Sequence, residues 1–255
     1  MIRCGRRIYA KDGTFKDPSF SGYYNVPVLT KSSKYGSLGP YILKNEKGQI
    51  MENLYQAHKV YKKVPRCIQR YSRYDSTVIW NHPEEIHVND DEELTDEYWA
   101  WRKKLSDNEY AVRYPVGFNG RHKCLYSLLK TEEKNSSEYD YYEQLDYIEA
   151  RKKVYAPLYI EMVRKQEQYA ELLDMLKKGK KLLVIEVDMP HQEDLEYYKE
   201  KYGVNDTFIV KDTMECTKKN IDIMLNDPKH PFGHGYCLAM ALLTDAGIEN
   251  FYELF

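Results

Sequence analysis

The chain has 255 residues, 42% of them hydrophobic, so it can bury a substantial core. It contains no run of about 18 apolar residues, and the N-terminal stretch MIRCGRRIYAKDG lacks the apolar centre of a secretory signal. We therefore expect a cytoplasmic protein that does not enter a membrane. A formal net charge of -2 argues against strong nonspecific nucleic-acid binding over the whole surface, although a local basic groove remains compatible with it.

The cysteines and tyrosines are informative about origin and redox state. The five cysteines are scattered and form no C-x-x-C pair, so we expect reduced thiols and neither a zinc site nor a disulfide framework. The 25 tyrosines, with abundant Lys, Asn and Asp, are typical of an A/T-rich genome such as that of a virus or phage. A viral protein would act in the cytoplasm of its host.

The first half of the chain shows few regular patterns. β-Branched and aromatic residues at 21–30 predict an edge strand, and helical spacing at 50–64 predicts a helix that Pro65 ends. A short helix is expected at 96–105 and an extended segment at 111–118. The polar stretch 130–144 reads as a surface loop.

The second half is more regular. Apolar residues recur every three or four positions over 146–178, where Pro157 should kink or divide a long helix and Gly179 should cap it. The apolar run KLLVIEVDMP at 181–190 predicts a central strand. Further helices are expected at 193–203, 213–227 and 247–255, and after the loop at 231–235. With no internal repeat and no clear linker, we predict one α+β domain, predominantly helical around a small β-sheet.

Two carboxylates lie in positions that could carry chemistry. Glu52 shares a polar stripe of the 50–64 helix with Gln56, Lys59 and Lys63, which could equally be a solvated face. Glu186 interrupts an apolar strand, and a buried carboxylate must be hydrogen-bonded, paired or protonated. Such groups are enriched in active sites, but a structural ion pair with an arginine such as Arg151 would explain it as well.

The segment NDPKHPFGHG, residues 226–235, places Asp227 and two histidines before an apolar helix. No further ligands of matching spacing accompany them, so a metal site is not favoured over a tight turn with a helix cap. Glycines before a helix start also allow an anion to approach unpaired N–H groups.

Arginine alternates with aromatic residues in RYSRYD, residues 70–75, and in AVRYPVGFNGRHKC, residues 111–124. This composition suits phosphate pairing and base stacking. It suits cation–π packing at a surface equally well.

The order of these segments resembles the NADAR superfamily, which includes the YbiA-like N-glycosidases. The stretch ENLYQAHK is similar to the family's E-x-x-Y/W-Q-A-x-K helix, and ELLDMLKKG followed by LLVIEV is similar to its later helix and strand. DPKHPFGHGYCLAMALL resembles the family's closing aromatic-Gly-x-Gly loop and helix, with Phe232 where a Trp is usual. Residues 66–144 have no counterpart in the family and are expected to be an insertion into a single NADAR-like domain spanning 1–255.

The resemblance implies hydrolysis of an N-glycosidic bond in an ADP-ribosyl or ribosyl-phosphate compound, free or attached to nucleic acid, without a metal or redox cofactor. Glu52 would be the principal carboxylate, with Asp227 or Glu186 as its partner. The expected substrate-binding residues are Gln56, Lys59, Arg113, Arg121, Phe232, Gly233, His234 and Gly235. A nucleic-acid-binding or nucleic-acid-processing protein and a noncatalytic nucleotide sensor are the alternatives.

Overall fold

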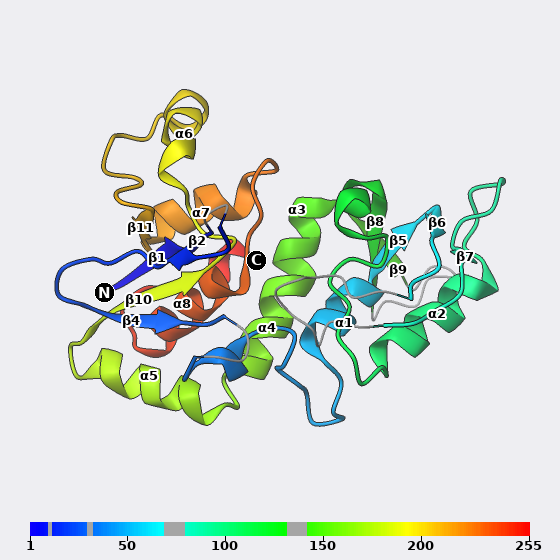
Figure 1. Cartoon of the computed structure of the whole chain (residues 1–255), viewed down its shortest axis with the longest axis horizontal. Coiled ribbons are helices and arrows are strands. Elements are labelled where there is room, and N and C mark those ends of the chain that lie inside the picture. Colours follow the sequence, from blue (N-terminus) through cyan, green and yellow to red (C-terminus); the bar gives the residue numbers. More distant parts are fainter. Residues whose placement is uncertain (10–11, 30–32, 69–79, 132–141) are drawn as a thin grey trace. The chain divides into compact units, whose positions relative to one another are not determined.

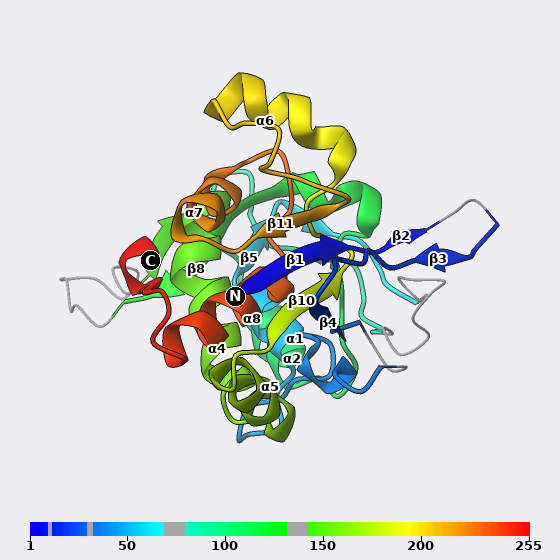
Figure 2. The same ribbon diagram turned by 90° about the vertical axis from the view of Figure 1, so that its left-hand side faces the viewer.

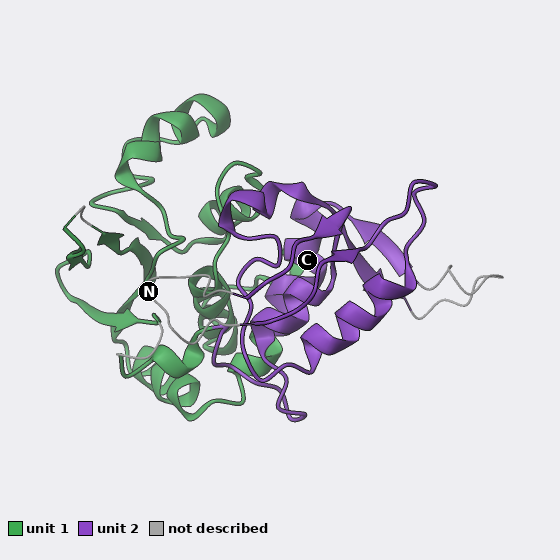
Figure 3. Ribbon diagram, turned by 45° about the vertical axis from the view of Figure 1, so that its right-hand side comes forward, with its two compact units in different colours: residues 1–39, 159–255 green, residues 40–158 purple. Residues whose placement is uncertain are grey.

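The computed structural model describes residues 1–9, 12–29, 33–68, 80–131 and 142–255. The RYSRYD segment and most of the 130–144 loop lie outside these residues. The chain divides into two compact units, residues 1–39 with 159–255 (unit 1) and residues 40–158 (unit 2) (Figures 1 and 3). Two compact units can belong to one domain, so the single-domain expectation stays a prediction.

Unit 1 is built on a four-stranded mixed sheet with the order β11-β1-β10-β4 (Figure 2). β10 is central and lies parallel to both β1 and β4, whereas β11 lies antiparallel to β1. The predicted central strand and edge strand are therefore confirmed. The strands of unit 1, including the small β2-β3 hairpin, are β1 (Ile2–Arg6), β2 (Ile8–Tyr9), β3 (Phe15–Lys16), β4 (Tyr23–Pro27), β10 (Lys181–Glu186) and β11 (Thr213–Glu215).

The helices of unit 1 include α8, which contacts β1 and β10 of the sheet, and α5, which contacts α8. Residues 234–243 of α8 are all buried, so this helix forms the centre of the core. The helices and short helical turns of unit 1 are η1 (Gly36–Leu38), α5 (Glu167–Lys177), η4 (Gln192–Asp194), α6 (Leu195–Tyr202), α7 (Lys218–Asn226), α8 (His234–Asp245) and η5 (Tyr252–Leu254).

Unit 2 combines a three-stranded antiparallel sheet of order β5-β8-β9, a β6-β7 pair and several helices. Its strands are β5 (Lys59–Tyr61), β6 (Lys63–Val64), β7 (Glu85–Ile86), β8 (Cys124–Lys130) and β9 (Tyr142–Leu145). Its helical segments are α1 (Met51–Ala57), α2 (Asp96–Ser106), η2 (Phe118–Lys123), α3 (Tyr147–Ala150) and the π-helical turn η3 (Arg151–Tyr155). α4 (Ala156–Val163) carries the chain from unit 2 into unit 1.

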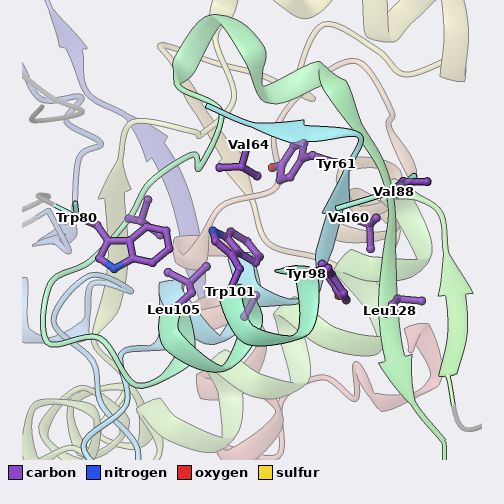
Figure 4. Close-up of a cluster of buried hydrophobic side chains, with 11 residues drawn as sticks. Val60, Tyr61, Val64, Trp80, Val88, Tyr98, Trp101, Leu105 and Leu128 are labelled. Atoms are coloured by element: carbon purple, nitrogen blue, oxygen red, sulfur yellow. The ribbon is translucent and has the colours of Figure 1, made fainter. Parts of the chain in front are cut away.

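An aromatic cluster forms the core of unit 2 (Figure 4). Trp101 and Tyr98 of α2 pack with Trp80 and with strand residues such as Val60 and Tyr61. Helix α2 begins where predicted, because the Thr95 hydroxyl caps it by accepting a hydrogen bond from the Tyr98 amide at 3.1 Å. Helix α2 therefore contributes large aromatic rings to the core of unit 2.

The predicted helix at 50–64 is wrong in its second half. Helix α1 ends at Ala57, and the chain turns at once into β5, which pairs with β8. The β-branched and aromatic residues Val60 and Tyr61 fit a pleated strand as well as a helical stripe, and pairing with β8 decides between the two. Lys59 and Lys63 consequently lie on strands and not on the helix that carries Glu52.

Other elements differ less from expectation. The 213–227 helix is limited to α7, because residues 213–215 form β11, and β1 was not predicted. The long 146–178 pattern is divided. The π-helical turn ends at Tyr155, two residues before Pro157, and Gly179 lies just beyond α5 at φ +82°. The 111–118 segment forms no strand. No described helix is both long and apolar enough to cross a membrane. The α+β class agrees with this mixture of helices and sheets.

Candidate functional site

Helix α1 presents a buried carboxylate and a buried amide on one face. Glu52 and Gln56 lie one turn apart, and the Gln56 Nε2 group donates a hydrogen bond of 2.6 Å to Glu52 Oε1. Only 7% of Glu52 and 1% of Gln56 are exposed. The Gln56 side chain thus orients the carboxylate instead of facing water, and the reading of this stripe as a solvated face is wrong for these two residues.

The same helix anchors an irregular segment from later in the chain. Asn53 Nδ2 donates to the carbonyl oxygens of Asn108 and Tyr110 at 3.2 and 2.9 Å, and Asn53 Oδ1 accepts from the Val112 amide at 2.9 Å. Gln56 Nε2 also donates to the Arg113 carbonyl oxygen at 2.7 Å. These bonds fix residues 108–113 against the helix that carries Glu52.

Lys59 adds a cation at the end of this helix. It is the first residue of β5 and is 8% exposed. Its Nζ lies 4.5 Å from the ring centroid of Tyr55 and 5.9 Å from that of Tyr114. Lys59 belongs to none of the ion pairs among the described residues, and Gln56 Oε1 has no hydrogen-bond partner there. The Lys59 ammonium group and the Gln56 Oε1 atom are therefore candidates for binding a charged or hydrogen-bonding group of a ligand.

Arg151 is a second buried cation of unit 2. It opens the π-helical turn η3, is 2% exposed, and places its guanidinium 4.2 Å from the ring centroid of Tyr147. Burial raises the pKa of Tyr55 well above its usual value; the Glu52 charge raises it further, whereas the Arg151 charge lowers it. Glu52 and Arg151 thus both act on the same tyrosine hydroxyl.

The predicted residues of unit 1 form different contacts. Glu186 ends β10 and is 1% exposed, and its Oε2 accepts a hydrogen bond from the Asp188 amide. A Cβ atom at Gly233 would overlap Glu186 Oε1, and one at Gly235 would overlap the end of Met189. The glycines of this loop therefore make room for the protein's own side chains at the start of α8.

The side chains of His234 and Phe232 also contact other residues of unit 1. His234 Nε2 donates to the Val28 carbonyl oxygen at 3.0 Å, and Nδ1 lies 3.4 Å from Glu186 Oε1. Burial lowers the pKa of His234 to about 4, although the Val28 bond opposes this. The buried ring of Phe232 stacks on Tyr236 with 4.8 Å between centroids.

Asp227 is the centre of a hydrogen-bonded cluster. Its Oδ1 accepts from the hydroxyls of Tyr197 and Tyr202 at 2.6 and 2.9 Å, and its Oδ2 lies 2.5 Å from His230 Nδ1. Burial opposes ionisation, but hydrogen bonds from Tyr197, His230 and Tyr202 outweigh it and hold the pKa of Asp227 well below its usual range. These contacts anchor α6 to Asp227, and they make the Asp227 carboxylate a weak base.

The structure thus brings together Glu52, Gln56, Lys59 and the Arg113 backbone within unit 2. Arg121 lies further along the same segment, on η2. Glu186, Asp227, Phe232, Gly233, His234 and Gly235 all belong to unit 1. No group of three or more metal-ligating side chains occurs in the part of the chain that is described.

The sequence alone gave no role to Asn53, Tyr55 or Tyr114, and it indicated Arg151 only as a structural ion-pair partner of Glu186. Asn53 has an identifiable signal, since an amide at an otherwise apolar helix position must find partners when buried.

No protein-family model, curated protein or solved structure matches this chain. The likeness to the NADAR superfamily therefore depends on the residues quoted above.

Proposed function

We propose that the chain is an N-glycosidase that hydrolyses the N-glycosidic bond of an ADP-ribosyl or ribosyl-phosphate compound. The observation that carries this proposal is the buried Glu52 carboxylate, held by Gln56 at 2.6 Å in the same unit as two buried cations, Lys59 and Arg151. A buried carboxylate in the same unit as buried cations suits a substrate that develops positive charge at one atom and carries negative charge at another.

The residues account for the main needs of the reaction. Cleavage of an N-glycosidic bond passes through an oxocarbenium-like state, which the negative charge of Glu52 would stabilise. The Lys59 ammonium, which lies near the rings of Tyr55 and Tyr114, would bind a phosphate group. The buried Gln56 Oε1 would accept a hydrogen bond from a sugar hydroxyl.

The second carboxylate of the mechanism stays a prediction. Glu186 and Asp227 lie in unit 1 and Glu52 lies in unit 2. The hydrogen bonds to Asp227 hold its pKa low and make it a poor proton acceptor.

The test compares the wild-type protein with Glu52→Gln. Each is incubated with NAD, ADP-ribose, ADP-ribosylated oligonucleotides and ribosylated pyrimidine phosphates, and the released base or ADP-ribose is followed by mass spectrometry. We expect release by the wild type and a loss of about 100-fold or more in Glu52→Gln, because an electrostatic contribution to the transition state is removed.

Glu109→Gln is the matched control, since Glu109 is an exposed carboxylate of the same unit. It should leave turnover unchanged. Equal turnover by wild type and Glu52→Gln would refute the proposal. Tight nucleotide binding by both proteins without any release would support the noncatalytic sensor instead.

A further inference from the structure

A basic and aromatic segment runs through residues 110–131 of unit 2. Between Glu109 and Glu132 the sequence contains no acidic residue, while it contains Arg113, Arg121 and Lys123. The whole chain has a net charge of -2, so this segment departs from the average charge of the molecule. A segment of net positive charge in a chain of net negative charge favours an anionic partner.

Guanidinium groups and rings alternate along this segment. The Arg113 guanidinium lies 5.5 Å from the Tyr114 ring centroid and 5.7 Å from that of Phe118, and the Arg121 guanidinium lies 4.4 Å from Phe118. Tyr114 and Phe118 meet edge to face at 5.9 Å. We call these four residues, Arg113, Tyr114, Phe118 and Arg121, the Arg-aromatic ladder.

The outer end of the ladder is open to solvent. Phe118 is 51% exposed, and Arg121 and Lys123 are exposed beside it on η2. An exposed ring beside two exposed cations, Arg121 and Lys123, offers a stacking surface and two phosphate-binding groups.

The inner end of the ladder reaches the Glu52 site. Lys59 Nζ lies 5.9 Å from the Tyr114 ring centroid, and Gln56 donates to the Arg113 carbonyl oxygen at 2.7 Å. The hydrogen bonds from Asn53 hold the preceding residues in place. A polymer bound along the ladder would therefore reach Glu52, the carboxylate that we propose to be catalytic.

We propose that the Arg-aromatic ladder binds a single strand of nucleic acid and leads a modified nucleotide of that strand to Glu52. Phe118 stacks on an unpaired base, and Arg121 and Lys123 bind phosphates. A duplex keeps its bases stacked and hidden, so only a single strand supplies the face that Phe118 needs. This proposal rests on the proposed function, but the ladder lies in residues 66–144, for which the family resemblance has no counterpart.

The experiment measures fluorescence anisotropy of a labelled single-stranded oligonucleotide and of the matching duplex, over a series of salt concentrations. Wild type should prefer the single strand, with affinity that falls as salt rises. Phe118→Ala should weaken binding about tenfold or more, because base stacking is lost. Arg121→Gln should reduce the slope of log affinity against log salt by about one.

Phe15→Ala is the matched control. Phe15 is 57% exposed, and its ring centroid lies 3.9 Å from the Arg7 guanidinium. However, Arg7 is paired with Asp17, and Phe15 belongs to unit 1. It should not change binding. Circular dichroism verifies that each variant is folded.

Two sets of results separate this proposal from the proposed function. If Phe118→Ala weakens strand binding and Glu52→Gln does not, the ladder is supported as a single-strand-binding surface even where no hydrolysis is found. Glu52-dependent hydrolysis of a free nucleotide without any strand binding would overturn the ladder proposal alone. Equal binding of single strand, duplex and polyglutamate, or equal effects of Phe118→Ala and Phe15→Ala, would overturn it too.

Discussion

Individual glycines and carboxylates acquire their meaning from contacts that the sequence does not display. Gly233 and Gly235 suggested a phosphate-facing turn, but Glu186 of the central strand occupies the space beside them. The glycines were correctly identified as positions of close approach, whereas the approaching group was a side chain of the same chain. The phosphate-binding role of this loop consequently stays a prediction without support from its contacts.

This packing predicts unequal effects of two similar substitutions. Gly233→Ala should lower the free energy of unfolding by about 1–3 kcal/mol, because the new methyl group overlaps the buried carboxylate of Glu186. Gly235→Ala should cost less, since its methyl group meets the flexible end of Met189 and alanine favours a helix. Urea denaturation of both variants measures the difference, and an equal or larger cost for Gly235→Ala would contradict this account.

At the scale of elements, one short helix organises the candidate site. Helix α1 has no side-chain N-cap and spans only Met51–Ala57, so its own propensity does not account for its stability. Its inner face is bonded through Asn53 and Gln56 to residues 108–113. The helix and the Arg-aromatic ladder therefore depend on one another.

Removing Asn53 should loosen this connection. In Asn53→Ala the carbonyl oxygens of Asn108 and Tyr110 and the amide of Val112 lose their partner, which should cost about 2–4 kcal/mol. Hydrogen exchange at the Val112 amide should accelerate. The control is Asn89→Ala, because the Asn89 side chain also accepts hydrogen bonds from two backbone amides but does so at an exposed turn. Slow exchange at Val112 in Asn53→Ala would show that other contacts hold the segment.

At the scale of the whole molecule, each unit has its own core. Unit 1 surrounds the central strand β10 and helix α8, and unit 2 surrounds the aromatic cluster of α2. His87 lies within that cluster, fully buried, and neither of its ring nitrogens has a hydrogen-bond partner in the described part of the chain. Burial and the neighbouring His82 lower its pKa to about 4.

The fold should therefore lose stability in mild acid. His87 is neutral in the folded state, while in the unfolded chain it would take up a proton near its ordinary pKa of 6.5. Its contribution to stability is complete above about pH 6.5 and falls as the pH drops toward 4, by about 3 kcal/mol in all.

His87→Phe tests this prediction. The variant removes the titrating group and fills the same apolar site, so its unfolding free energy should change less between pH 7 and pH 4.5 than that of the wild type. His122→Phe, a substitution at an exposed histidine of the same unit, is the control. Identical pH dependence in His87→Phe and wild type would show that other groups cause the acid sensitivity.

The sequence by itself determined the elements whose patterns are long or strongly apolar. Helices α2, α5 and α8 and strand β10 were predicted because helical spacing, caps and an uninterrupted apolar run are local properties. Helical spacing also placed Glu52 and Gln56 on one face of a helix, whereas the roles expected for them came from the family resemblance.

Only the tertiary structure decided the conformation of segments whose pattern fits both a helix and a strand. It alone also decided which distant segment supplies a residue's partner. Val60 and Tyr61 became a strand because β8 was available to pair with them, and β11 formed because β1 lay beside it. The same holds for Gln56 with Arg113, for Glu186 with Gly233, and for the unit boundaries. Periodicity records which face of an element is apolar, but not which distant residue will cover it.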